Sequence, residues 1–128
     1  MPNPDYADLA ADLGEMCSNV ADVIGDYLHQ NIGNLPKAKV TSLEAQLSQV
    51  TANANKFLEL SDQIAFTGLA TYLQGVQNAT TSIQQDLKTI ANIDKAIAIT
   101  TAVLELATAI LTANGSALGA AVQTIGSI

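Results

Sequence analysis

The side chains that could do chemistry are few in this chain, and they are scattered along it. His29, the single histidine, stands three residues after Asp26, so the two side chains would share one face of a helix. Cys17 is the single cysteine, and no serine or cysteine lies in a nucleophile motif. We interpret His29 as a surface residue and Cys17 as a small buried hydrophobe. The sequence therefore predicts a protein that is not an enzyme.

The composition also excludes several kinds of binding site. One histidine and one cysteine are too few for a zinc site or an intramolecular disulfide. All five cationic residues are lysines and the net charge is −7, so the chain lacks the clustered cations that nucleic acid requires. We expect no metal ion, no cofactor and no nucleic-acid partner.

The length and the apolar pattern predict the architecture. A chain of 128 residues of which 48% are hydrophobic is expected to form one domain over residues 1–128. All three prolines lie before residue 37, which leaves the rest of the chain able to form long helices. No segment alternates polar and apolar residues as a strand does. We expect an all-α, up-down antiparallel four-helix bundle with a short apolar C-terminal fifth helix or tail.

The first helix is predicted from a cap at Asn3–Pro4 to about residues 31–33. One of its faces is apolar, and a separate face is acidic because the first 31 residues hold six acids and no lysine. The predicted apolar stripe comprises Leu9, Leu13, Met16, Val20, Val23 and Tyr27. The acidic stripe is a candidate docking face for a basic partner, or else a solvated helix face. Its residues are Asp5, Asp8, Asp12, Glu15, Asp22 and Asp26.

The bounds of the second and third helices follow from a cap and a shift of the apolar stripe. A capping box at residues 41–44 predicts the start of the second helix. The stripe changes its phase between Ser61 and Gly68, where we expect a break. The third helix then continues through Gly75 to about Ile90. The alternative is a turn at Gly75, which would give two longer helices.

The fourth helix is predicted from about Ile93 to Ala113, with Asn92 as its cap and Asn114–Gly115 as its end. After this end, apolar residues with helical spacing predict the short fifth helix or tail. Together the two segments supply a candidate interaction surface. Its members are Ile99, Val103, Leu106, Ile110, Leu118, Val122 and Ile125.

Residues 96–128 carry a single charged side chain, Glu105. Because threonines share its predicted helix face, we expect that face to be a solvent-exposed edge. Gly115 and Gly119 form a GxxxG pattern, which in membranes permits close contact between helices. A membrane-spanning fourth helix is disfavoured, since a carboxylate at its midpoint costs a few kcal/mol and basic flanking residues are absent.

Two functions are compatible with this sequence. The first is a non-enzymatic helical bundle that associates with a protein partner or with a second copy of itself. The second is a membrane-active protein that inserts its nearly uncharged C-terminal third into lipid; this pattern is similar to that of α-helical pore-forming toxins. Residues 1–5 contain no basic or apolar run, so we expect no conventional signal peptide and a soluble protein whose compartment stays open.

Overall fold

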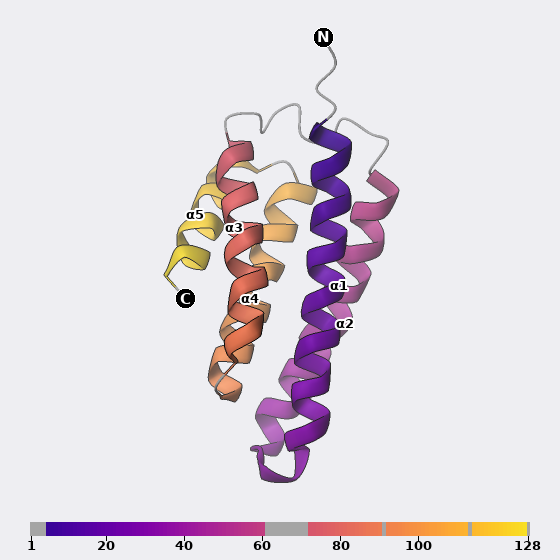
Figure 1. The fold of residues 1–128 in the computed structure, drawn as a ribbon, viewed down its shortest axis with the longest axis vertical. Coiled ribbons are helices and arrows are strands. Elements are labelled where there is room, and N and C mark those ends of the chain that lie inside the picture. The colour runs from indigo at the N-terminus through magenta and orange to yellow at the C-terminus, as the bar shows by residue number, and fades with distance from the viewer. Residues whose placement is uncertain (1–4, 61–71, 91, 113, 128) are drawn as a thin grey trace.

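The structure is a computed structural model that describes residues 5–60, 72–90, 92–112 and 114–127 (Figure 1). This part of the chain consists of helices and short connections without any strand, which confirms the expected all-α class. Five α-helices pack against one another. They are α1 (Asp5–Asn31), α2 (Lys37–Leu60), α3 (Leu73–Asp86), α4 (Ile93–Leu111) and α5 (Gly115–Gly126), with the 3-10 turns η1 (Ile32–Asn34) and η3 (Leu87–Thr89).

The helices α1 and α2 form a long hairpin, which η1 closes at the lower end of the view in Figure 1. The end of α1 at Asn31 confirms its predicted C-terminus. The predicted start of the second helix was wrong, because α2 begins at Lys37 and residues 41–44 lie inside it. The carbonyl of Pro36 accepts a hydrogen bond from the amide of Val40 at 3.1 Å, so the first helical turn follows the proline directly. The predicted cap at residues 3–4 and the predicted break at residues 61–68 lie outside the described residues.

The fifth helix belongs to the wall of the bundle. It packs against both α4 and α3, whereas α3 and α4 make little contact with each other. On the other side, α1 packs on α3 and α2 packs on α4. The predicted C-terminal helix is therefore confirmed, and it packs on two others.

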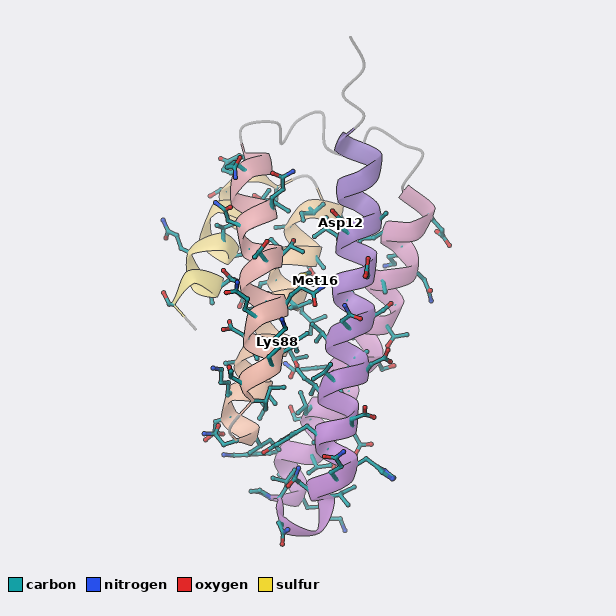
Figure 2. The ribbon with its side chains drawn as sticks, viewed as in Figure 1. Asp12, Met16 and Lys88 are labelled. Atoms are coloured by element: carbon teal, nitrogen blue, oxygen red, sulfur yellow. The ribbon has the colours of Figure 1, made fainter. Side chains whose placement is uncertain are left out.

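The buried face of α1 differs in part from the predicted stripe. Val23 is 37% exposed and Tyr27 is only half-buried. The face of α1 that packs on α2, its main neighbour, is offset from the predicted stripe and includes other apolar residues. The buried large side chains of α1 are Leu13, Met16, Cys17, Val20, Ile24 and Leu28. Figure 2 shows Met16 directed into the bundle.

Asparagine caps begin the last two helices. The side chain of Asn92 accepts a hydrogen bond from the amide of Lys95 at 2.8 Å, which confirms the predicted cap of α4. The side chain of Asn114 accepts one from the amide of Ala117 at 3.1 Å, so Asn114 starts α5. The pattern Asn114–Gly115 predicts the end of the fourth helix, and α4 does end before it, at Leu111. Asparagine suits both ends of a helix, and here the amides at the start of α5 need an acceptor.

Glycines let α5 approach α3 closely. Gly75 lies inside α3, as predicted, and a methyl group at this position would lie 3.4 Å from Cγ1 of Val122 on α5. The ring of Tyr72 lies over Gly115 and Gly119, where an added methyl group would be 3.0 Å and 3.7 Å from the nearest ring atom. The GxxxG pattern thus serves a contact within the chain.

Alanine substitutions at these two glycines are expected to have opposite effects. Gly115→Ala should destabilise the fold by about 1 kcal/mol, because the new methyl group meets the Tyr72 ring and forces it to move. Gly119→Ala, with ordinary contact distances inside a helix, should be neutral or stabilise by up to about 1 kcal/mol. Urea melts of both variants measure the difference. In a Tyr72→Ala background the cost at Gly115 should disappear, and its persistence would contradict the proposed contact.

Candidate binding grooves

The predicted interaction surface is largely buried within the chain. Six of its seven side chains lie in the core, and the seventh, Val122, is half-buried against Gly75. In the packed chain these residues therefore belong to the core and do not form an accessible surface. Their helical stripe is the face by which α4 and α5 join the core. The six buried residues are Ile99, Val103, Leu106, Ile110, Leu118 and Ile125.

The acidic stripe of α1 is exposed wherever its side chains are described. Asp12, Glu15, Asp22 and Asp26 all face solvent, while the side chains of Asp5 and Asp8 lie outside the described set. Figure 2 labels Asp12 near the upper end of α1. In the described part of the chain, the one ion pair is elsewhere. It joins Lys39 of α2 to Asp94 of α4 at 2.7 Å.

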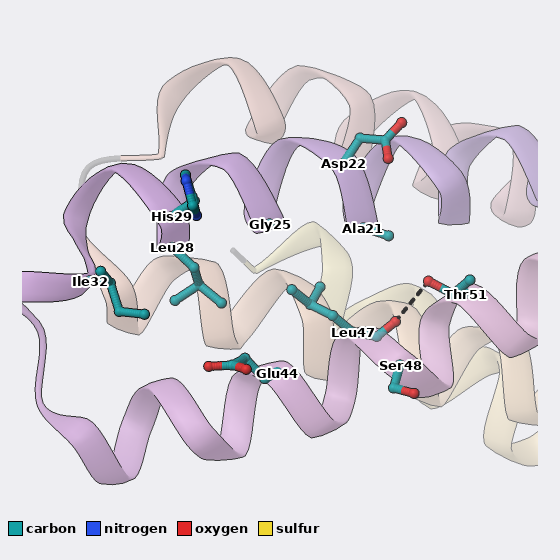
Figure 3. Close-up of a pocket in the computed structure, with 10 residues that line it drawn as sticks. All are labelled: Ala21, Asp22, Gly25, Leu28, His29, Ile32, Glu44, Leu47, Ser48 and Thr51. Carbon is teal, nitrogen blue, oxygen red and sulfur yellow. Dashed lines mark hydrogen bonds between the residues drawn. The ribbon is translucent and has the colours of Figure 1, made fainter.

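A groove of about 530 Å³ runs between α1 and α2 (Figure 3). Leu28, Ile32 and Leu47 supply its large apolar side chains, and the acidic residues Asp22 of α1 and Glu44 of α2 belong to its lining. Figure 3 shows the carboxylate of Asp22 directed away from α2, at the border of the groove. The remaining lining residues are Ala21, Gly25, His29, Ser48 and Thr51. The groove is thus apolar in its large side chains and acidic in its formal charge.

A second hollow, of about 370 Å³, adjoins this groove at the closed end of the hairpin. The two hollows share Ile32 and Glu44, and the second adds Leu35 and Val40 among its apolar residues. The side chain of Ile32 is 56% exposed, although it is a large hydrophobe. We use the name hairpin groove for the two hollows together. Sequence reasoning missed it because Ile32 stood out only as part of a helix end.

A separate groove of about 500 Å³ lies between α4 and α5. Its walls combine Leu104 and small apolar residues with polar groups that lie along one edge of α4. Glu105 is its one charged residue and is exposed. The small residues are Ala109, Ala117, Ala120 and Ala121, and the polar ones, besides Glu105, are Thr101, Thr108, Thr112 and Asn114. The exposed edge predicted around Glu105 is therefore the border of a groove.

The substitution Glu105→Gln is expected to change the free energy of unfolding by no more than about 0.5 kcal/mol. The side chain is exposed, and no lysine among the described residues pairs with it. Urea melts of the variant and the parent protein measure this change. A loss above about 2 kcal/mol would mean that the carboxylate is buried and paired in solution.

The potential catalytic residues do not assemble into a site. His29 is exposed at the hairpin groove, whereas Cys17 lies on the same helix with no exposed surface. Burial raises the pKa of the Cys17 thiol to about 12, which keeps it protonated and unreactive near neutral pH. In the described ranges, no three His, Cys, Asp or Glu side chains lie close enough together to hold a metal ion.

Among the helices that the structure describes, none combines the length and hydrophobicity that crossing a bilayer requires. Comparison of the chain with protein-family models, with curated protein sequences and with solved structures finds no match. A function for this chain must therefore follow from its own grooves and charges.

Proposed function

We propose that this protein is a non-enzymatic association module whose hairpin groove binds a basic amphipathic helix of a partner protein. The observation that carries the proposal is the position of Ile32, a large hydrophobe with 56% exposure, in a groove that carboxylates flank. Exposed apolar side chains inside a polar border are typical of binding surfaces.

The charges favour a basic partner over an acidic one. Asp22 and Glu44 belong to the lining of the groove, and the exposed acids of α1 continue along the same helix. Lys37, at the end of the second hollow, is the one lysine that lines the hairpin groove. The negative electrostatic field of these carboxylates speeds the encounter with a cationic partner and disfavours an anionic one.

The dimensions favour a helix. Along α2, the hairpin groove extends from Lys37 to Thr51, a span of about 21 Å at 1.5 Å per residue. A helix of four turns has this length, and its apolar residues at i, i+3, i+4 and i+7 would lie along Leu47, Ile32 and Leu35. The proposal includes an up-down antiparallel arrangement of α1–α4, with α5 packed against α3 and α4.

Calorimetry with a synthetic peptide tests the proposal. The probe is a 14-residue amphipathic helix with leucines on one face and lysines on its flanks, and its control carries glutamates in place of the lysines. We expect the lysine peptide to bind and the glutamate peptide to fail. Raising the salt concentration should weaken binding, because exposed charges are screened.

Two variants locate the binding site. Ile32→Ser should weaken binding about tenfold, since it removes an exposed apolar contact and leaves the core intact. Glu59→Gln removes an exposed carboxylate of α2 outside the groove and should leave the affinity unchanged. Equal binding of both peptides, or an unchanged affinity of Ile32→Ser, would reject the hairpin groove as the site. A concentration-dependent dimer in sedimentation velocity that excludes the peptide would favour a second copy as the occupant.

A further inference from the structure

The groove between α4 and α5 is separate from the hairpin groove and has a different character. Its volume of about 500 Å³ lies in the range of small-molecule sites, roughly 300–1,000 Å³. Four alanines line it where larger side chains would fill it. The packing of α5 against α4 builds this groove, so it exists only when the C-terminal helix is in place.

Two polar groups of this groove, Glu105 and Thr112, offer hydrogen-bond acceptors. The carboxylate of Glu105 is an acceptor with a negative charge. The hydroxyl of Thr112 donates its proton to the carbonyl of Thr108 at 2.7 Å. This hydroxyl can therefore only accept a hydrogen bond from a ligand. The hydroxyl oxygen of Thr101 already accepts a bond from Nε2 of Gln46 at 3.1 Å, so this group keeps its proton as a donor.

We propose that the α4–α5 groove binds a small apolar molecule with one positive charge, such as an alkylammonium ion, and that Glu105 is its counter-ion. The ammonium group donates three hydrogen bonds, which match the carboxylate and the hydroxyl oxygen of Thr112. The alkyl chain lies over the alanines and Leu104. An anionic amphiphile of the same length meets the field of Glu105 and is repelled.

Three probes of equal chain length test the charge selectivity of the full-length protein. They are n-octylammonium, 1-octanol and octanoate, each titrated below the concentration at which it forms micelles. Amide chemical shifts in ¹H–¹⁵N NMR spectra report the position of binding and the affinity. We expect n-octylammonium to shift the amides of α4 and α5 and to bind about fivefold more tightly than 1-octanol, in line with one exposed ion pair. Octanoate should bind more weakly than both.

Variants test the contribution of the Glu105 charge to binding separately from that of the apolar wall. Glu105→Gln should reduce the affinity for n-octylammonium to that of 1-octanol, whereas Glu59→Gln, on α2, should leave it unchanged. Ala120→Leu places a larger side chain in the groove from an exposed position of α5 and should abolish binding of all three probes. Ala98→Leu, at an exposed position of α4 outside the groove, is its matched control.

Several results would overturn the proposal. Equal affinities for the three probes would show that charge plays no part, and an undiminished affinity of Glu105→Gln would remove the counter-ion. Shifts centred on α1 and α2 would place these molecules in the hairpin groove. Because the peptide experiment uses other residues, either proposal can fail while the other stands.

Discussion

Leu118→Ala is expected to lower the free energy of unfolding by about 2–5 kcal/mol, the usual cost of emptying a buried leucine site. Leu118 has no exposed surface, and it lies on the helix that packs against both α3 and α4. Those two helices have little contact of their own, so they cannot easily close on the space. Urea melts followed by circular dichroism measure the loss. Ser116→Ala, at an exposed position of α5, is the control and should stay within about 0.5 kcal/mol of the parent protein.

Deleting residues 115–128 extends the same test. Without α5, the faces of α3 and α4 that it covers become exposed, and we expect the cooperative unfolding transition to be lost. A truncated protein that unfolds at the same urea concentration as the full chain would show that α5 is dispensable for the core. It would also contradict the result expected for Leu118.

The second large effect is a loss of stability in alkali that depends on Cys17. Burial raises the pKa of this thiol from 9.0 to about 12. Above pH 9 the unfolded chain releases the thiol proton while the folded chain retains it, so stability falls as the pH rises from 9 to about 12. Each pH unit in this interval should remove about 1.4 kcal/mol. Below pH 9 the thiol is protonated in both states and contributes no pH dependence.

The variant Cys17→Ala isolates the contribution of this thiol to the loss of stability in alkali. Urea melts under reducing conditions at pH 8, 9, 10 and 10.5 should show a steeper decline for the parent protein than for the variant. At pH 8 the folded parent should resist thiol reagents and react only as it unfolds. Parallel pH profiles of the two proteins, or rapid labelling of the native state, would contradict the burial of Cys17.

Local sequence patterns predicted where the helices lie better than they predicted which helices pack against each other. The C-terminal end of α1 and the cap at Asn92 followed from short-range rules that hold wherever a helix begins or ends. The start of α2 was wrong because residues 41–44 satisfy the capping-box pattern, yet the turn after Pro36 already has its hydrogen bond. The capping-box pattern and the proline were both valid signals for a helix start, and nothing in the sequence shows which of the two is used.

The candidate sites were predicted less well, for a different reason. Periodicity identifies which residues of a helix are apolar, but it does not say whether another helix covers them. The stripe of α4 and α5 looked like an exposed surface only because its partner helices were unknown. Ile32 and Glu44 belong to different helices and meet through the hairpin, so no linear pattern could join them.

By itself, the sequence determined an all-α chain with an acidic first helix, a buried Cys17 and a single charge near the C-terminus. These properties depend on residue types and on spacings within one helix turn. Only the tertiary structure decided that α5 packs on both α3 and α4, that Tyr72 lies on Gly115, and where the two grooves run. The reason is physical: a groove is made by the side chains of two helices, and the choice of neighbour depends on packing of the whole core.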